Sequence, residues 1–202
     1  MSLRGNEEIR AFVDKLSATN VPDYVDLPMI AVMGETSSGK SALLSSISGV
    51  ELPSASELTT RCPIKLQMKR AEKKHATVSV QWKESLVGEI RKGEVFADKT
   101  VTEENYRNLP KVILEAQQHI INDTGKEVSR HVVCVKVEGP LCEDLTLIDL
   151  PGIVRTRGKD EGESIVEDID ELIKEYLRNK RCIILAVVPA NVGKYLSSLT
   201  HY

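Results

Sequence analysis

The residues best suited to chemistry lie in one glycine-rich segment, Gly34-Glu-Thr-Ser-Ser-Gly39-Lys40-Ser41, here called the P-loop. It matches the pattern G-x-x-x-x-G-K-S/T at every fixed position. Such glycines let the backbone wrap a diphosphate, so that N–H groups and the start of a following helix point at its oxygens. Lys40 would reach the β- and γ-phosphates, and the Ser41 hydroxyl would bind Mg²⁺. The predicted nucleotide contacts are Gly34, Glu35, Thr36, Ser37, Ser38, Gly39, Lys40 and Ser41.

A second segment, Asp149-Leu150-Pro151-Gly152, follows the apolar run 145–148. An aspartate at the carboxyl end of a strand beside the P-loop strand can hold Mg²⁺, directly or through water. A glycine three residues further on can present its N–H to a γ-phosphate. Taken alone, this sequence is a common turn. Paired with the P-loop, it favours a switch-type nucleotide site.

Between these two segments, residues 56–63 form a polar stretch that contains Thr60. A threonine hydroxyl in a loop after the P-loop helix could sense Mg²⁺ and the γ-phosphate. The predicted ligands of the Mg²⁺ ion would then be Ser41, Thr60 and Asp149. On these residues alone, an ordinary polar loop is the better interpretation of residues 56–63.

The surrounding pattern predicts elements that could position these segments. Apolar runs of strand length occur at 29–33, 63–68, 76–82, 131–137, 145–148 and 182–188. Helical spacing of apolar residues occurs at 6–18, 40–48, 110–122 and 165–177. Residues 84–108 are charged and weakly patterned. Alternating strands and helices predict an α/β fold, a P-loop three-layer sandwich with a central, mostly parallel sheet, preceded by an N-terminal helix.

Composition narrows the class of protein. The chain has 202 residues and a formal net charge of −3, which argues against a protein built mainly to read nucleic acid. Its four cysteines show no metal or disulfide spacing and fit a reducing compartment. The longest apolar run, 182–188, is far shorter than the ~20 residues that cross a bilayer. We therefore expect a cytoplasmic protein.

Several ordered segments resemble the dynamin superfamily of large GTPases, and within it the interferon-induced Mx branch. They are LPMIAV at 27–32, the P-loop, LP at 52–53, TRCP at 60–63, LTLIDLPGI at 145–153 and VPANV at 188–192. The resemblance divides the chain into an N-terminal helix and linker at 1–26, a partial dynamin-type G domain at 27–192 and a divergent tail at 193–202.

The resemblance implies a GTPase that uses Mg²⁺, with Thr60 positioning the attacking water and Ser37 offsetting charge in the transition state. It also implies self-assembly, an innate antiviral or membrane-remodelling role, and microtubule, membrane or viral nucleoprotein targets. Two other hypotheses are a non-catalytic fragment that binds nucleotide weakly and associates with full-length relatives, and a P-loop ATPase or kinase.

Two departures from the family pattern matter. Thr36 stands at a catalytic P-loop position where the family usually has glutamine. The guanine-reading motif N/T-K-x-D is absent from the 202 residues, and the sequence after Val192 no longer resembles the family. We therefore expect a truncated or alternatively ended G domain with weak selection of the base.

Overall fold

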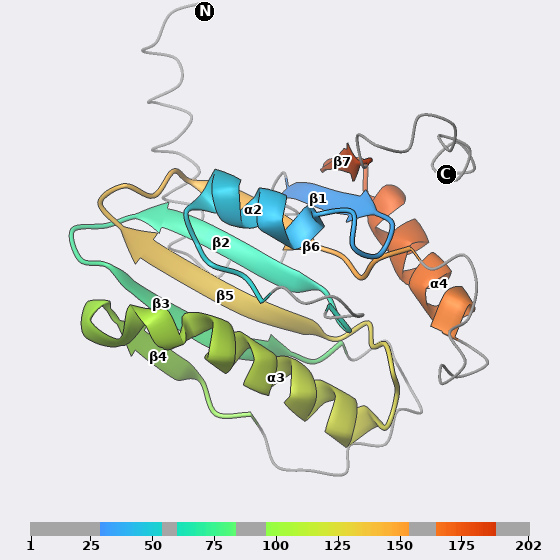
Figure 1. The fold of residues 1–202 in the computed structure, drawn as a ribbon, viewed down its shortest axis with the longest axis horizontal. Helices are drawn as coiled ribbons and strands as arrows, with labels where there is room; N and C mark the ends of the chain where they lie inside the picture. Colours follow the sequence, from blue (N-terminus) through green and yellow to red (C-terminus); the bar gives the residue numbers. More distant parts are fainter. Residues whose placement is uncertain (1–28, 54–59, 84–95, 154–164, 189–202) are drawn as a thin grey trace, which may run out of the picture.

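The computed structural model describes residues 29–53, 60–83, 96–153 and 165–188, and within them a seven-stranded sheet carries helices on both faces (Figure 1). The strands lie in the order β4-β3-β5-β2-β6-β1-β7. Their bounds are β1 (Met29–Gly34), β2 (Ile64–Arg70), β3 (His75–Gln81), β4 (Lys99–Thr102), β5 (Val132–Gly139), β6 (Leu145–Asp149) and β7 (Cys182–Val187).

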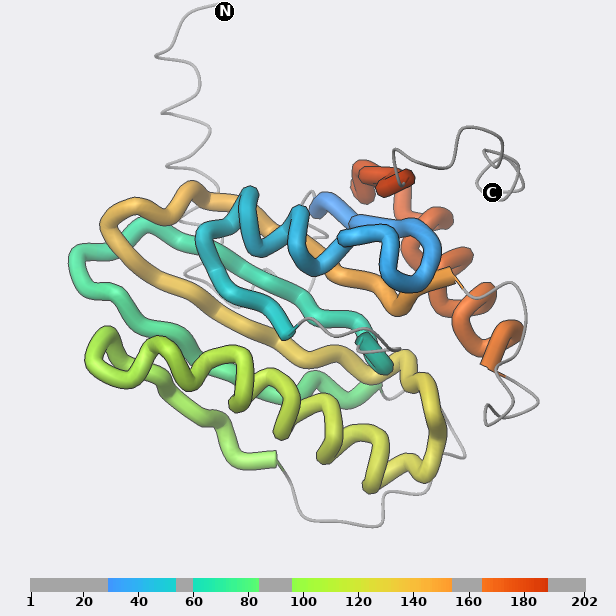
Figure 2. Tube along the Cα trace, viewed as in Figure 1, coloured from blue at the N-terminus to red at the C-terminus, as the bar shows by residue number. Residues whose placement is uncertain are grey.

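Three α-helices form the outer layers. Helices α2 (Lys40–Ser48) and α3 (Leu109–Thr124) cover one face of the sheet, and α4 (Ile165–Leu177) covers the other (Figure 2). The alternation of β1 shows why both faces are buried: Val32 packs into the core beneath α2 and α3, whereas Ala31 and Met33 pack beneath α4. The predicted α/β three-layer sandwich is confirmed.

The sheet is mixed, and its parallel part surrounds the P-loop. Strand β1 runs parallel to both β6 and β7, and β2 runs parallel to β5. The pairs β2–β6, β3–β4 and β3–β5 are antiparallel. Two short connections explain why β3 runs opposite to β2 and why β6 runs opposite to β5. These connections are 71–74 and 140–144, and a parallel crossover needs roughly a dozen residues or more.

Most of the predicted elements are confirmed to within a residue or two at each end. The weakly patterned region 84–108 also contains structure, namely β4 and a 3₁₀ helix, η2 (Glu103–Asn108). The predicted helix at 6–18, the rest of segment 1–26 and the tail at 193–202 lie outside the described residues. Among the helices that the structure describes, none is long and apolar enough to cross a membrane.

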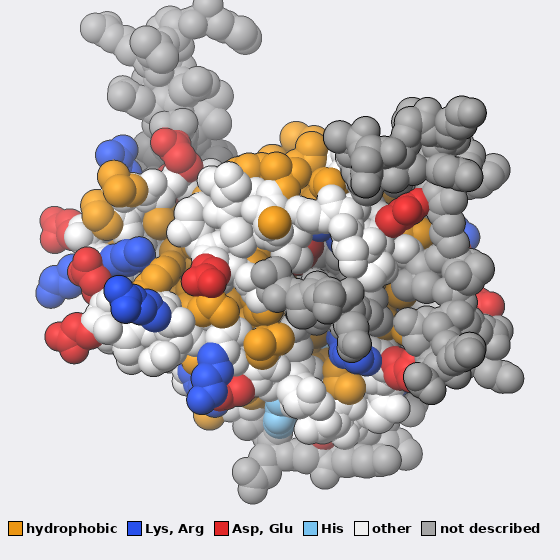
Figure 3. Space-filling view, in the orientation of Figure 1, with side chains coloured by type: hydrophobic (Ala, Val, Ile, Leu, Met, Phe, Trp, Pro, Cys, Tyr) orange, Lys and Arg blue, Asp and Glu red, His pale blue; other side chains and the backbone are white. Residues whose placement is uncertain are grey.

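One edge of the sheet exposes apolar side chains. Strand β7 has a single neighbour, β1, among the described strands, and Ile183 is 62% exposed. Helix α2 packs against β1 and β6, and its residues Leu43 and Ile47 are also exposed. Val188, directly after β7, is exposed as well. We call these four residues the β7 patch; Figure 3 shows apolar side chains gathered above α2 in this region.

We expect the 202-residue chain on its own to self-associate through the β7 patch. Among the described residues the outer edge of β7 has no partner strand, and such an edge flanked by apolar side chains favours pairing with another chain. Ile183→Lys should shift the population towards monomer, measured by sedimentation velocity at micromolar concentration. The matched control is Leu141→Lys, at the most exposed large apolar residue of the described chain, in the β5–β6 turn. Wild-type protein that stays monomeric at this concentration would contradict the prediction.

Candidate phosphate-binding site

The P-loop connects the carboxyl end of β1 to the first turn of α2. Two residues of its turn have positive φ, Ser37 at 60° and Gly39 at 92°, and Gly39 is the residue that precedes α2. Gly34 lies so close to β7 that a Cβ atom there would stand 2.4 Å from the Val187 carbonyl oxygen. The pattern glycines are therefore required by the backbone, which places the loop around the N-terminus of α2.

The segment after β6 packs directly against the P-loop. Because β1 and β6 are parallel neighbours, Asp149 lies beside Val32, just before the P-loop begins. Two backbone bonds join the loops: the Thr36 N–H donates to the Ile153 carbonyl at 3.2 Å, and the Ile153 N–H donates to the Gly34 carbonyl at 2.9 Å. The predicted Asp149–Gly152 segment thus forms the second wall of the site.

Gly152→Ala should weaken this contact. A Cβ atom at Gly152 would meet the Cα of Thr36 at 2.7 Å and its backbone nitrogen at 2.9 Å, so the two loops would have to separate. We expect a loss of about 1–3 kcal/mol in the free energy of unfolding, measured by urea denaturation. Gly139→Ala is the control, since its nearest neighbour would lie at 3.5 Å. Equal stability of the two variants would contradict the prediction.

Three oxygen-bearing side chains from separate parts of the chain meet at the end of β6. Ser41 Oγ donates to Asp149 Oδ2 at 2.7 Å, and Thr60 Oγ1 donates to the same oxygen at 3.3 Å. Thr60 reaches this point because β2 pairs with β6 in a register that places Ile64 opposite Asp149. The residue pattern alone favours an ordinary polar loop at 56–63, and the family resemblance implies a site role for Thr60; the structure brings the Thr60 hydroxyl to Asp149.

The electrostatics of the site come from two buried opposite charges. Lys40 and Asp149 are 6% and 0% exposed, and Lys40 Nζ donates to the Glu35 carbonyl at 2.8 Å. Burial lowers the pKa of Lys40, while the charge of Asp149 acts in the opposite direction. Burial raises the pKa of Asp149, and the Ser41 hydrogen bond, the Lys40 charge and the Thr60 hydrogen bond oppose that rise. Each charge therefore helps to keep the other ionised.

Three buried polar atoms beside this pair have no hydrogen-bond partner in the described structure: Thr36 Oγ1, Ser38 Oγ and Asp149 Oδ1. Native proteins satisfy nearly all such atoms, so a cluster of exceptions indicates a ligand site. No group of three His, Cys, Asp or Glu side chains suited to a metal occurs among the described residues. Two hydroxyls and one carboxylate instead suit Mg²⁺, which takes few protein ligands and completes its shell with phosphate and water.

The remaining predicted residues fall around this centre. Ser37 is exposed on the P-loop, and Gly39 is exposed at its end. Leu150 and Pro151 are buried, and Leu150 packs into the core beneath α4, so only their backbone could face a ligand. Ile153 is not among the predicted contacts, because its contribution to the site is made by its backbone N–H and carbonyl. Arg155 and Arg157, which follow the Asp149–Gly152 segment, lie outside the described residues.

These features define a P-loop α/β domain. They are a glycine-rich loop between a parallel strand and a helix, a buried lysine on that helix and an aspartate on the adjacent strand. The family model described as the dynamin family matches residues 30–198. The chain belongs to the dynamin family.

Interferon-induced GTP-binding proteins are similar in sequence to most of this chain. The chain is 37% identical to interferon-induced GTP-binding protein Mx1 of Rattus norvegicus over 180 residues, which are 89% of this chain and 26% of the rat protein. It is 38% identical to Mx1 of Ovis aries over 180 residues, 89% of this chain and 25% of the sheep protein. The chain therefore spans about a quarter of the length of these relatives.

Proposed function

We propose that this chain binds GTP and hydrolyses it to GDP, with Mg²⁺ as cofactor. The observation that carries the proposal is the cluster of unpartnered buried atoms, Thr36 Oγ1, Ser38 Oγ and Asp149 Oδ1, beside the Lys40 ammonium at the N-terminus of α2. Such a site suits a polyphosphate. The choice of guanine rests on the relatives, which are named GTP-binding proteins.

The proposal gives each site residue a role. The P-loop amides and Lys40 bind the phosphates, and Ser41, Thr60 and Asp149 hold the metal. Bound Mg²⁺ would neutralise charge on the phosphate oxygens. Catalysis is in-line attack of water on the γ-phosphate, driven by positioning and electrostatics rather than by a strong base. Thr60 orients the attacking water, Ser37 offsets charge in the transition state, and Thr36 replaces the family's glutamine.

The wider properties belong to the proposal as well. We propose self-assembly of the longer protein through its G domain and stalk, a cytoplasmic location, and an innate antiviral or membrane-remodelling role. The targets that we propose by family resemblance are microtubules, membranes or viral nucleoprotein. The alternative function is non-catalytic association with full-length relatives, with weak nucleotide binding; the observation that favours it is that the 202 residues contain no N/T-K-x-D motif.

Calorimetric titration of GTP, GDP and ATP, each with and without Mg²⁺, tests the proposal. We expect GTP and GDP to bind, Mg²⁺ to strengthen GTP binding, and the preference for GTP over ATP to be small, because phosphate contacts alone do not read the base. Binding without turnover would favour the fragment alternative. Failure of every nucleotide to bind would refute the proposed function, and a clear preference for ATP would redirect it to the ATPase or kinase class.

A further inference from the structure

The turn between α3 and β5, residues 125–131, lies against the segment that carries Thr60. The Ser129 N–H donates to the Arg61 carbonyl at 2.9 Å, and Arg61 follows Thr60 directly in the chain. The regular pairing of β2 with β5 begins only at Ile64. The bond from Ser129 therefore extends the contact between these two parts of the chain beyond the sheet, towards the end of β6.

The Ser129 side chain fixes the shape of this turn. Ser129 is 2% exposed, and its Oγ accepts the His131 N–H at 3.3 Å. His131 is held in turn by the Lys83 N–H, which donates to its Nδ1 at 3.0 Å, and by the ring of Trp82, whose centroid lies 4.7 Å away. A serine hydroxyl that bonds the backbone two residues further on stabilises a turn. It thereby keeps the Ser129 N–H directed at the Arg61 carbonyl.

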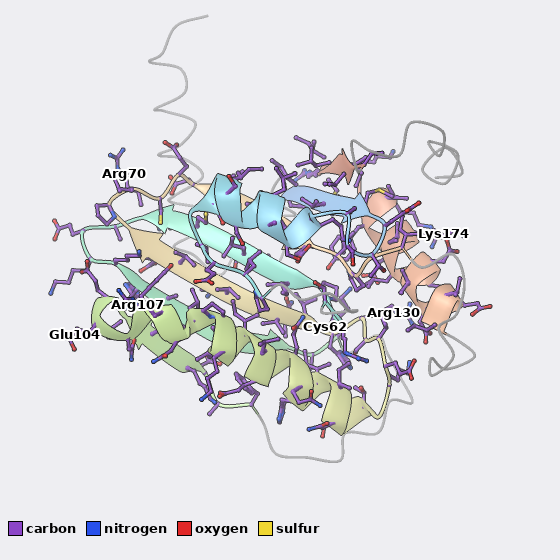
Figure 4. The ribbon with its side chains drawn as sticks, in the orientation of Figure 1. Cys62, Arg70, Glu104, Arg107, Arg130 and Lys174 are labelled. Atoms are coloured by element: carbon purple, nitrogen blue, oxygen red, sulfur yellow. The ribbon has the colours of Figure 1, made fainter. Side chains whose placement is uncertain are left out.

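The turn also packs with the second wall of the phosphate-binding site. Val128 is 2% exposed and belongs to the same core cluster as Leu150 and Ile153. Next to Ser129, the Arg130 guanidinium lies 3.7 Å from the Glu171 carboxylate of α4. Figure 4 shows Arg130 at the same end of the sheet as Cys62. The turn thus contacts both the Thr60 segment and the core beneath the Asp149–Gly152 segment.

The position of the Thr60 hydroxyl depends on its backbone. Its bond to Asp149 Oδ2 measures 3.3 Å, longer than the ~2.7–2.8 Å that is typical between a hydroxyl and an oxygen acceptor. Such a long bond is weak and does not hold the side chain by itself. The Arg61 carbonyl, one residue away, is held by a backbone bond of ordinary length.

We propose that Ser129 is a positioning residue for Thr60. Its N–H holds the Arg61 carbonyl, and its hydroxyl fixes the turn that directs this N–H, so that Thr60 Oγ1 lies beside Asp149. The inference rests on the proposed function for the role of Thr60 at the metal and the γ-phosphate. It adds to the site a turn that carries no nucleotide-binding motif.

The test compares Ser129→Ala with Ser48→Ala. Ser48 Oγ also accepts an N–H from two residues further on, that of Val50 at 3.1 Å, but at the end of α2 remote from the P-loop. We expect both variants to lose similar stability and to keep their affinity for GDP. Only Ser129→Ala should lose affinity for a non-hydrolysable GTP analogue with Mg²⁺, roughly fivefold, the effect of one hydrogen bond. Equal affinities of the two variants for the analogue would overturn the proposal.

A double-mutant cycle shows whether Ser129 acts through Thr60. In a Thr60→Ala background, Ser129→Ala should cause no further loss of affinity for the analogue, because the group that it positions is already absent. A second, independent fivefold loss would overturn the proposal. If alanine at position 129 prevents folding, Ser129→Cys replaces it, since a thiol is a weak acceptor of similar size.

A further measurement needs no nucleotide. In the free protein, the NMR signal of the Thr60 methyl group, assigned with Thr60→Ala, should shift in Ser129→Ala and stay in place in Ser48→Ala. An unchanged Thr60 signal in Ser129→Ala would overturn the proposal whatever the nucleotide results. If the signal shifts but wild-type protein binds no nucleotide, Ser129 does position Thr60 and the proposed function fails.

Discussion

Lys40→Ala should abolish nucleotide binding. Lys40 is the buried cation at the N-terminus of α2, and its ammonium is held in the P-loop by the Glu35 carbonyl. A charge-assisted contact with phosphate is among the strongest polar interactions in proteins, so we expect a loss of at least roughly 100-fold in affinity for GTP and GDP. Titration calorimetry measures it directly.

Two controls keep this prediction decisive. Removing Lys40 also leaves Asp149 without its opposite charge, so circular dichroism must show that the variant folds, and Lys40→Met preserves the buried stem if alanine does not. Lys69→Ala removes an exposed lysine at the end of β2 and should bind nucleotide like wild type. Undiminished binding by a folded Lys40 variant would remove the P-loop from the proposed site.

Thr60→Ala should leave GDP binding intact and stop hydrolysis. The Thr60 hydroxyl meets Asp149 Oδ2 at 3.3 Å, beside the position proposed for the metal and the γ-phosphate, so its contribution arises only with a triphosphate and an attacking water. Loss of one such preorganised group costs roughly 100-fold or more in rate. Single-turnover hydrolysis is the measurement, in a chain continued after Val192 with the base-contacting region of a relative.

Thr59→Ala is the matched control, because it removes the neighbouring hydroxyl from the same segment. We expect it to hydrolyse GTP at nearly the wild-type rate. If Thr60→Ala is unimpaired while Thr59→Ala is inactive, the switch threonine is Thr59. The geometry at Asp149 favours Thr60, because its hydroxyl donates to Asp149 Oδ2.

The P-loop and its flanking elements could be predicted because they depend on local pattern. The strand before Gly34 and the helix after Gly39 follow from a short apolar run and from helical spacing, and the structure confirms both. Placing Asp149 beside the P-loop also needed little more than the rule that ligand sites form at the carboxyl ends of neighbouring parallel strands. A contact at the carboxyl ends of two neighbouring parallel strands is therefore within the reach of sequence reasoning.

Long-range contacts were harder to predict. The sequence does not reveal that β2 pairs antiparallel to β6, yet this register is what brings Thr60 to Asp149. β4 buries only Val101, so it left no alternating pattern to detect. The bond between the Ser129 N–H and the Arg61 carbonyl is also hidden from the sequence, because it joins two backbone groups that lie far apart in the chain.

The packing of Trp82 against His131 has an optical consequence. The chain contains one tryptophan, so its tryptophan emission comes from a single residue, Trp82, directly after β3. Trp82 is connected to residues 60–63 through His131, Ser129 and the Arg61 carbonyl, and it is not part of the P-loop. We therefore expect tryptophan fluorescence, excited at wavelengths that tyrosine does not absorb, to respond to a change at residues 60–63 without an added dye.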